Sequence, residues 1–425
     1  MLAGVIVAST LFAACSDDDK SSDSTDAPET TGATDTTGAP ESTLPPKSPI
    51  VIGGTFDTSG LTGVPESIKV VEAWATYINA MGGINGHPVE LDIRDTAGDP
   101  AKAASQTTEV LANDPVLFLV QSSSTEASQA EALIASGIPI MGAGYSPALW
   151  GGSIAAFGLE CGPDAPIPCA ASNVFPISTT FGAVVDEQVL GAQAAGATKL
   201  AVAACAEVEA CSQAGPVFEA TAKAVGIASV GTTKVSSTAT DYSAECISWI
   251  NQGVDFIQIS GGASLAEGLY ASCTDQGYTG IFGASAGSVS GKLITLDGIT
   301  LAGGLNGFPW FVDDPLVAEY TEAMKAGGVS DEGIHSPTAT ALWSVLQLFA
   351  KANADLVDEP TAAIVLENMY TITDETLGGL IAPTTFYKDQ PGPEKARNCF
   401  WPYILKDGEF TNPLGGLTVQ CYPEV

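Results

Sequence analysis

The sequence has little positive charge: 15 lysines and arginines stand against 49 aspartates and glutamates, a net charge of −34. A chain this acidic has no electrostatic route to phosphate backbones or anionic lipid surfaces, which excludes nucleic-acid binding. Histidine is also scarce, at two in 425 residues, and the sequence holds no CxxC motif or Cys/His cluster. Zinc binding is therefore disfavoured, and we expect neither a metal nor a cofactor.

The amino end carries an apolar run, LAGVIVASTLFAAC, that ends at Cys15. The run is too short to span a bilayer, and its small residues are typical of a secretory cleavage site. LFAAC resembles a bacterial lipobox, which implies a lipid on Cys15 that anchors the protein to the outer face of the cell membrane. We therefore predict a lipoprotein signal peptide over residues 1–15. Neither Lys nor Arg precedes the run, which leaves room for an earlier start.

Two further regions follow the signal peptide. Residues 16–48 consist mainly of Ser, Thr, Asp, Gly and Pro. Such a segment cannot bury enough surface to offset its ordering entropy, so we predict a disordered tether. From residue 49 onward, strand-like runs alternate with helical patterns, which predicts an α/β fold with parallel sheets and right-handed crossovers. A Gly- and Pro-rich interruption at 151–172 separates two successive units of this type.

Helical periodicity predicts which faces are buried. In residues 64–81 one helical face carries Ile68, Val71, Trp74, Ile78 and Met81. A second predicted helix opens at Ser336-Pro337 and is expected to be amphipathic. Its apolar side would carry Leu342, Val345, Leu346 and Phe349.

Capping and turn signals mark the ends of other elements. Asp99 is a predicted N-cap because Pro100 follows it at the first helical position. Asp407-Gly408 separates two strand-like runs, which predicts a hairpin. Tyr242 is expected to be a buried residue at a helix start.

The stretch QSSSTEASQ after the apolar run VLFLVQ predicts a binding site. Ser123 and Glu126 have the spacing of a capping box at the start of a helix. A helix N-terminus offers free backbone N–H groups and a positive dipole end, which suit an anionic ligand group. Three hydroxyls crowd this turn although capping needs only one, so we favour a ligand seat over capping alone.

The chain has nine cysteines. If Cys15 carries the lipid, eight remain in an oxidising compartment, where structural disulfides are expected. Proximity along the chain favours local pairs, although many connectivities are possible. The expected pairs are Cys161–Cys169, Cys205–Cys211, Cys246–Cys273 and Cys399–Cys421.

Residues 73–103, AWATYINAMGGINGHPVELDIRDTAGDPAKA, resemble the leucine/isoleucine/valine-binding proteins, the solute receptors of ABC importers. Residues 120–150 resemble the next block of that family, and a weaker similarity runs to about residue 350. The resemblance implies two Rossmann-like lobes with parallel sheets, joined by a three-segment hinge. Lobe 1 would comprise 49–172 with about 308–382, and lobe 2 would comprise 173–307 with about 383–425. The crossings would lie near 173–178, 305–312 and 380–386.

The resemblance also implies a ligand site in the cleft between the lobes. Ser122 matches the family serine that holds the ligand carboxylate, and Ala143 to Tyr145 match a loop that supplies a carbonyl and a hydroxyl. Tyr145, Cys211 and Ser285 depart from the family pattern, which has an acidic residue suited to an ammonium group where Ser285 stands. We therefore expect an amino-acid-like, carboxylate or amide ligand. The expected contacts are Ser122, Ser123, Ser124, Ala143, Gly144, Tyr145, Phe181, Ser285 and Trp310.

Two hypotheses compete with an importer component. GASAG, residues 283–287, fits the G-x-S-x-G elbow of serine hydrolases, and Asp297 and His335 follow Ser285 in the order of that fold. The serine would need a histidine within reach. His87 lies in the turn INGHP, and His335 is expected in an exposed loop. A ligand-sensing receptor of the same fold is the other alternative.

We favour a non-enzymatic receptor that is monomeric. Its expected partners are a small-molecule ligand, an ABC permease, and the membrane reached through the Cys15 lipid. The acidic run Asp92, Asp95 and Asp99 could suggest calcium, but it lacks EF-hand spacing, so helix capping and a solvated strand end are favoured. Trp310 and Phe311 fit either an apolar ligand wall or core packing.

Overall fold

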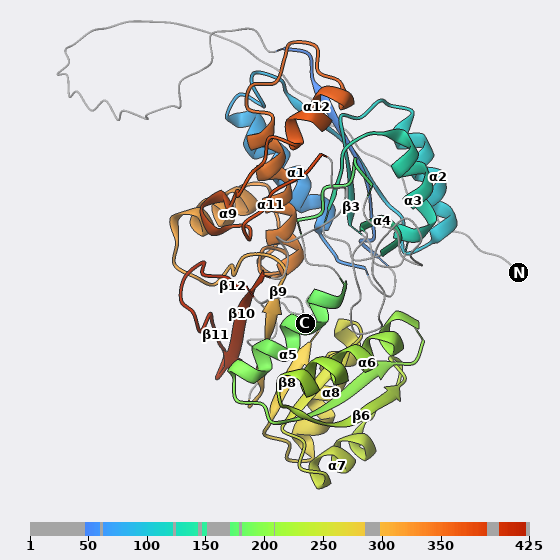
Figure 1. The fold of residues 1–425 in the computed structure, drawn as a ribbon, viewed down its shortest axis with the longest axis vertical. Coiled ribbons are helices and arrows are strands. Elements are labelled where there is room, and N and C mark those ends of the chain that lie inside the picture. Colours follow the sequence, from blue (N-terminus) through green and yellow to red (C-terminus); the bar gives the residue numbers. More distant parts are fainter. Residues whose placement is uncertain are drawn as a thin grey trace, which may run out of the picture. The chain divides into compact units, whose positions relative to one another are not determined.

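The computed structural model describes residues 47–59, 63–121, 125–142, 147–150, 171–177, 181–207, 209–284, 298–388 and 399–421 (Figure 1). Leu44–Val425 forms one compact unit built around two sheets. Within the described ranges, no helix combines the length and the apolar character needed to cross a membrane.

The first sheet has four parallel strands in the order β2-β1-β3-β4. Its strands are β1 Ile50–Phe56, β2 Val89–Asp95, β3 Leu117–Gln121 and β4 Ile140–Gly142, and the helices between and after them are α1 Ser67–Ala80, α2 Pro100–Leu111, α3 Glu126–Ser136 and α4 Pro147–Trp150.

Helices cover both faces of the first sheet (Figure 1). On one face α2 and α3 enclose a core that includes Val110, Phe118 and Leu133. On the other face α1 packs against α9 and α11. The later helices are α9 Pro315–Ala326, α10 Asp331–Ile334, α11 Pro337–Ala352 and α12 Ala362–Met369, with a 3-10 turn, η4, at Leu377–Gly379.

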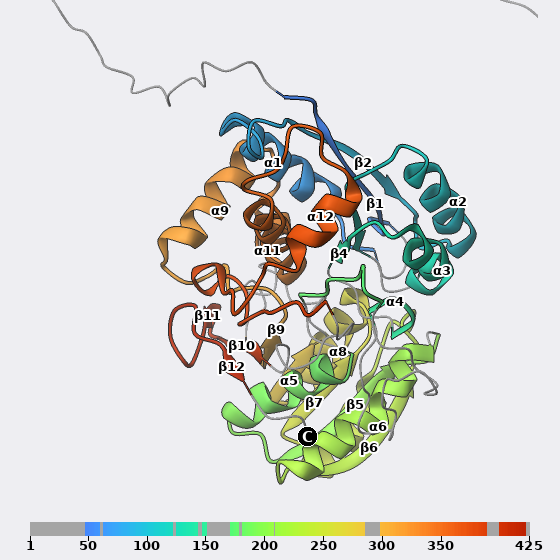
Figure 2. The ribbon, with the colours of Figure 1, turned by 45° about the horizontal axis from the view of Figure 1, so that its top comes forward.

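The second sheet follows the order β11-β10-β9-β8-β7-β5-β6, and β12 pairs with β10. Strands β5 to β9 are parallel, and β10 runs antiparallel to β9. The strands are β5 Lys199–Cys205, β6 Ala228–Val235, β7 Phe256–Ser260, β8 Ile281–Ala284, β9 Thr300–Leu305, β10 Cys399–Lys406, β11 Glu409–Thr411 and β12 Gln420–Cys421. The helices of this part of the chain are α5 Phe181–Ala194, α6 Glu209–Ala224, α7 Ser243–Asn251 and α8 Ala263–Asp275. Figure 2 shows α5, α6 and α8 beside the sheet, and α7 is labelled in Figure 1.

The described chain passes between the two sheets three times. After β4, residues 171–177 lead to α5, which packs on β9 of the second sheet. After β9 the chain enters α9, which packs on α1 beside the first sheet. From η4, which contacts α11, the chain then returns to β10 in the second sheet. The exact lobe boundaries stay a prediction.

Several local predictions are confirmed. The Asp99 side chain accepts hydrogen bonds from the amides of Ala101 and Lys102 and caps α2. Ser336 caps α11 in the same manner. The Asp407-Gly408 turn joins β10 to β11, with both residues at positive φ, 54° and 78°. Each prediction used only neighbours in the sequence, and tertiary packing did not override them.

Two predictions about helix faces need correction. Met81 is not on the buried face of α1; the helix ends at Ala80, and Met81 is 67% exposed. The predicted apolar side of α11 is buried, but every residue from 337 to 346 is buried as well, so the helix lacks the exposed polar side expected there. This helix contacts α1, α12, η4 and β4, so apolar neighbours surround it on all sides.

Three of the four expected disulfides are present, while Cys161 and Cys169 lie outside the described residues. Cys205–Cys211 joins the end of β5 to the first turn of α6, and Cys399–Cys421 joins β10 to β12. Cys246–Cys273 joins α7 to α8 and is completely buried. It closes a segment with a sequence separation of 27 residues.

Replacing Cys246 and Cys273 together by alanine should lower the free energy of unfolding by about 3.5 kcal/mol, because the unfolded chain regains the entropy of the closed loop. Denaturant titration of the oxidised protein measures the loss. Replacing Cys399 and Cys421 opens a disulfide-closed loop of similar length, with a separation of 22 residues. A similar loss of stability in this variant would show that chain entropy alone accounts for the effect. No loss in the first variant would contradict a structural role for the α7–α8 disulfide.

A buried carboxyl group lies where α5 meets the second sheet. Glu187 of α5 is completely buried beside β9, and a Cβ added at Gly304 would lie 2.7 Å from its Cβ. Burial raises the pKa of Glu187 well above its ordinary value, the neighbouring Asp186 raises it further, and Gln188 opposes the shift only in part. The folded protein therefore keeps the Glu187 proton at pH values where the unfolded chain releases it.

This difference predicts that stability falls as the pH rises above about 4.5, where the unfolded glutamate ionises, until the folded group ionises too. Glu187→Gln should remove this component and flatten the decline by up to about 1.4 kcal/mol per pH unit. Denaturant titrations between about pH 5 and about pH 8 compare the two proteins. Parallel profiles would contradict a neutral Glu187 in the folded state.

Candidate functional site

The carboxyl edge of the first sheet gathers buried polar groups. Strands β1, β2, β3 and β4 are parallel, so their carboxyl ends meet at one edge. Ligands of open α/β sheets bind at that edge. The polar side chains buried in or near it are Thr55, Asp57, Thr96, Thr107, Gln121, Thr125, Glu126 and Gln129.

The amide of Gln129 in α3 links three elements of this edge. Its Oε1 accepts hydrogen bonds from the hydroxyls of Thr55 in β1 at 2.6 Å and Thr107 in α2 at 2.8 Å. Its Nε2 donates to Thr125 Oγ1 at 3.3 Å. A buried amide is costly unless hydrogen-bonded, so these bonds fix α3 against β1 and α2.

Asp57 extends this arrangement to the strand ends. Its Oδ1 accepts hydrogen bonds from the hydroxyls of Thr96, which follows β2, and Thr125, which precedes α3, the latter at 3.4 Å. Its backbone N–H donates to the carbonyl of Gln121, the last residue of β3, at 3.0 Å. We refer to Thr55, Asp57, Thr96, Thr107, Thr125 and Gln129 as the Asp57 network.

The start of α3 differs from the predicted capping box. The helix begins at Glu126 with Thr125 as its N-cap, two residues later than a box between Ser123 and Glu126 requires. Thr125 makes no side-chain capping bond because its hydroxyl is engaged with Asp57 and Gln129. Glu126 is buried in the first turn, where the positive end of the helix dipole stabilises a negative charge. The prediction of a helix start after β3 holds, but its capping chemistry is wrong.

Gly142 ends β4 immediately before the predicted loop 143–145. Its φ is 157°, and a Cβ at this position would lie 1.8 Å from the carbonyl oxygen of Val120. Only glycine permits β3 and β4 to approach this closely where both strands end. Steric exclusion by the backbone of β3 therefore explains why the first residue of the sequence GAG, Gly142, is glycine.

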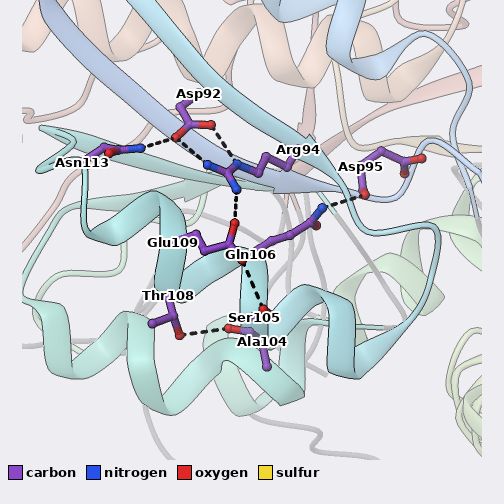
Figure 3. A network of polar contacts seen from close by, with 9 residues as sticks. All are labelled: Asp92, Arg94, Asp95, Ala104, Ser105, Gln106, Thr108, Glu109 and Asn113. Atoms are coloured by element: carbon purple, nitrogen blue, oxygen red, sulfur yellow. Dashed lines mark hydrogen bonds and ion pairs between the residues drawn. The ribbon is translucent and has the colours of Figure 1, made fainter.

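Protein partners account for the acidic run, of which Asp92 and Asp95 lie in β2 and Asp99 follows it; Figure 3 shows the partners of Asp92. Asp92 pairs with Arg94 at 2.9 Å and accepts from Asn113, and the Arg94 bond lowers the pKa of Asp92. Asp95 is partly buried, which raises its pKa, but the amides of Thr58 and Ala97 and the hydroxyl of Ser59 outweigh that effect. These bonds, with the Asp99 cap, give the run the structural role that was favoured.

The carboxyl edge of the second sheet is tied together by different bonds. The Cys205–Cys211 disulfide holds α6 against β5, and Ser260 Oγ at the end of β7 donates to the Cys211 carbonyl at 3.2 Å. Glu207 accepts from Ser236 Oγ at 2.6 Å, and this bond chiefly lowers the pKa of Glu207 to about 2. Ser285 directly follows β8, which ends at the same edge because Ala284 pairs with Ile259 of parallel β7.

Three predicted aromatic positions are described. Phe181 is the first residue of α5. Trp310 is 7% exposed, and its ring meets Phe311 and Phe410 edge to face at 5.5 Å each. Trp310 thus belongs to an aromatic cluster with the β11 residue Phe410. Tyr242 is buried at the start of α7, as predicted, and its hydroxyl donates to the Ser236 carbonyl at 2.7 Å.

The two histidines have different structural settings. The ring nitrogens of His87 lie 2.7 Å and 2.9 Å from the carbonyl oxygens of Ser48 and Val357, so this buried side chain joins three segments. His335 is the C-cap of α10 and is half-buried rather than exposed as expected. Burial lowers the pKa of His335.

Most of the predicted ligand positions cannot be located in the described structure, and the residues that it does bring together were missed. Asp57, Thr125 and Gln129 are separated by up to 72 positions, so no local pattern connects them. A usable signal was polar residues directly after a buried strand, as in DTS at 57–59. The predicted positions outside the described residues are Cys15, Ser122, Ser123, Ser124, Ala143, Gly144, Tyr145 and Ser285.

Solved structures with the same fold cover most of this chain. An extracellular ligand-binding receptor from Verminephrobacter eiseniae has a TM-score of 0.67 at 15% identity, over 85% of this chain and 99% of its own. A branched chain amino acid ABC transporter protein from Thermus thermophilus, with bound valine, has a TM-score of 0.66 at 15% identity, with 87% and 96% coverage. A fatty acid ABC transporter substrate-binding protein from Thermomonospora curvata has a TM-score of 0.63 at 19% identity, with 86% and 91% coverage.

No curated protein matches the sequence. Residues 49–407, in contrast, match the family described as periplasmic binding protein. The α/β architecture with two largely parallel sheets agrees with the two-lobed fold of that family. The chain therefore belongs to the periplasmic binding protein family.

Proposed function

We propose that this protein is the substrate-binding component of an ABC importer, anchored outside the cytoplasm by a lipid on Cys15. It would bind a small polar ligand between its lobes as a monomer and deliver it to a permease in the cytoplasmic membrane. The family match over residues 49–407 supports an extracytoplasmic solute-binding role. Of the similar structures, one holds valine and another is named for fatty acids, so this chain's own residues must indicate the ligand.

The Asp57 network is the observation that carries the proposal. It bonds to both elements that flank residues 122–124 in the sequence: the Asp57 N–H donates to Gln121 at the end of β3, and Asp57 and Gln129 bond to Thr125 at the start of α3. A rigid support lowers the entropy that a loop loses when it binds a ligand. This support favours Ser122, Ser123 and Ser124 as the contacts of the ligand's polar group.

The other predicted contacts divide between the lobes. Ala143, Gly144 and Tyr145 follow β4 on lobe 1 and would bind the ligand together with the three serines. Phe181 and Ser285 of lobe 2, together with Trp310 at the crossing near 305–312, would join the ligand when the lobes close. The measured affinity would then include the equilibrium between open and closed forms.

Thermal shift of the full chain against a ligand panel tests the function. The panel holds branched and aromatic amino acids, their amides, short carboxylates and ester substrates. A ligand at about 100 times its dissociation constant stabilises the protein by about 2.7 kcal/mol, which raises the melting temperature measurably. Ester turnover that disappears in Ser285→Ala, without any shift from the other compounds, would instead indicate a hydrolase.

Ser122→Ala should weaken binding of the best panel compound about tenfold, because one hydrogen bond to its polar group is lost. Calorimetric titration measures the dissociation constant. Ser136→Ala is the matched control, since the Ser136 hydroxyl donates to the Leu133 carbonyl in the last turn of α3, at the end of the helix away from residues 122–124. Equal affinities of both variants would contradict the placement of the ligand at residues 122–124.

A further inference from the structure

The charge at the start of α3 bears on the class of ligand, given the proposed function. Asp57 is completely buried, and its Oδ1 lies 3.4 Å from the hydroxyl of Thr125, the N-cap of α3. Its main chain is held on both sides, by the bond to Gln121 and by the Val64 amide, which donates to the Asp57 carbonyl at 2.8 Å. The carboxylate is therefore fixed beside the helix terminus.

A helix N-terminus attracts negative charge, but this one already has acidic neighbours. Asp57 lies at the N-cap, and Glu126 is buried in the first turn. A ligand carboxylate placed at the same turn would lie close to the like charge of Asp57. Such repulsion is weakly screened where water is excluded.

A second buried polar group at this edge lacks a hydrogen-bond donor within the ranges that the structure describes. Gln121 is 6% exposed, and its Oε1 has no hydrogen-bond partner in the described part of the chain. It is the last residue of β3, immediately before the three serines. A carboxylate cannot donate to such an acceptor, whereas an amide or ammonium group can.

We propose that Asp57 is a specificity-determining residue that disfavours ligands with a free carboxylate at the start of α3, beside Thr125 and Gln121, and selects an uncharged or cationic donor group, such as a primary amide. The net charge of −34 acts in the same direction, because it lowers the local concentration of anions. This inference rests on the proposed function and names the class of ligand group that the start of α3 accepts.

A purely structural role for Asp57 makes a different prediction. Asn at position 57 retains an oxygen that accepts from Thr96 and Thr125 but lacks the charge. If Asp57 only supports the fold, Asp57→Asn would change the binding of acids and amides by the same factor. If its charge selects the ligand, the ratio between the two affinities changes.

Calorimetric titration of the full chain with matched pairs, isoleucine with isoleucinamide and isovalerate with isovaleramide, measures this ratio. The wild type should bind the amide of a pair at least tenfold more tightly than the acid. Asp57→Asn should reduce that preference at least tenfold. Asp99→Asn removes one charge near the same edge and retains the α2 cap, so it should leave the ratio unchanged.

A wild-type preference below tenfold, or an unchanged ratio in a folded Asp57→Asn protein, would overturn the inference while leaving the receptor function intact. If the Asn variant does not fold, the wild-type ratio decides alone. Binding of neither member of either pair to any of the three proteins, with no other panel compound bound, would overturn the proposed function together with this inference.

Discussion

The buried amide of Gln129 is the group on which the carboxyl edge of the first sheet depends. It bonds to β1, α2 and the N-cap of α3 at once, and no water can replace these bonds where the side chain is 1% exposed. Asp57 then connects that N-cap to the end of β2 through Thr96. Each partner satisfies a polar group that would otherwise be costly to bury, so the network holds as a unit. The described residues on either side of the predicted ligand loop, Gln121 and Thr125, are both bonded to this network.

The second sheet reaches the same rigidity by other means. Here a disulfide, a serine hydroxyl and the carboxylate of Glu207 tie the loops after β5, β6 and β7 together. Away from that edge, α5 lies close to β9 because Gly303 and Gly304 have no side chains, and Glu187 is buried in the contact. The elements α5, β9 and β10 are also those that the chain enters or leaves when it passes between the sheets.

Local patterns in the sequence predicted most of the fold. Alternation and period gave the strands and helices, Asp99 and Ser336 gave two helix starts, and Asp407-Gly408 gave the hairpin. The buried surroundings of α11 were missed because the sequence of one helix does not reveal how many neighbours pack on it. The Asp57 network was missed for the same reason: its members belong to β1, α2, α3 and two loops. A capping box was expected at Ser123 because the spacing rule considers only neighbours, whereas Thr125 is held by the distant Asp57.

The negative charge of Asp57 beside the start of α3 would affect which ligand groups this receptor accepts there. A ligand group at the start of α3 would meet backbone donors and the Oε1 of Gln121, which has no partner among the described residues, so a group that both donates and accepts would be satisfied on both sides. An anion would accept from those donors but leave Gln121 Oε1 unpaired, a larger loss than a missing apolar contact. Discrimination would therefore arise from the open form of lobe 1, before closure adds contacts from lobe 2. Closure that stabilises two ligands equally leaves the ratio of their affinities unchanged, so a preference set in the open form by one buried aspartate would persist in the closed receptor.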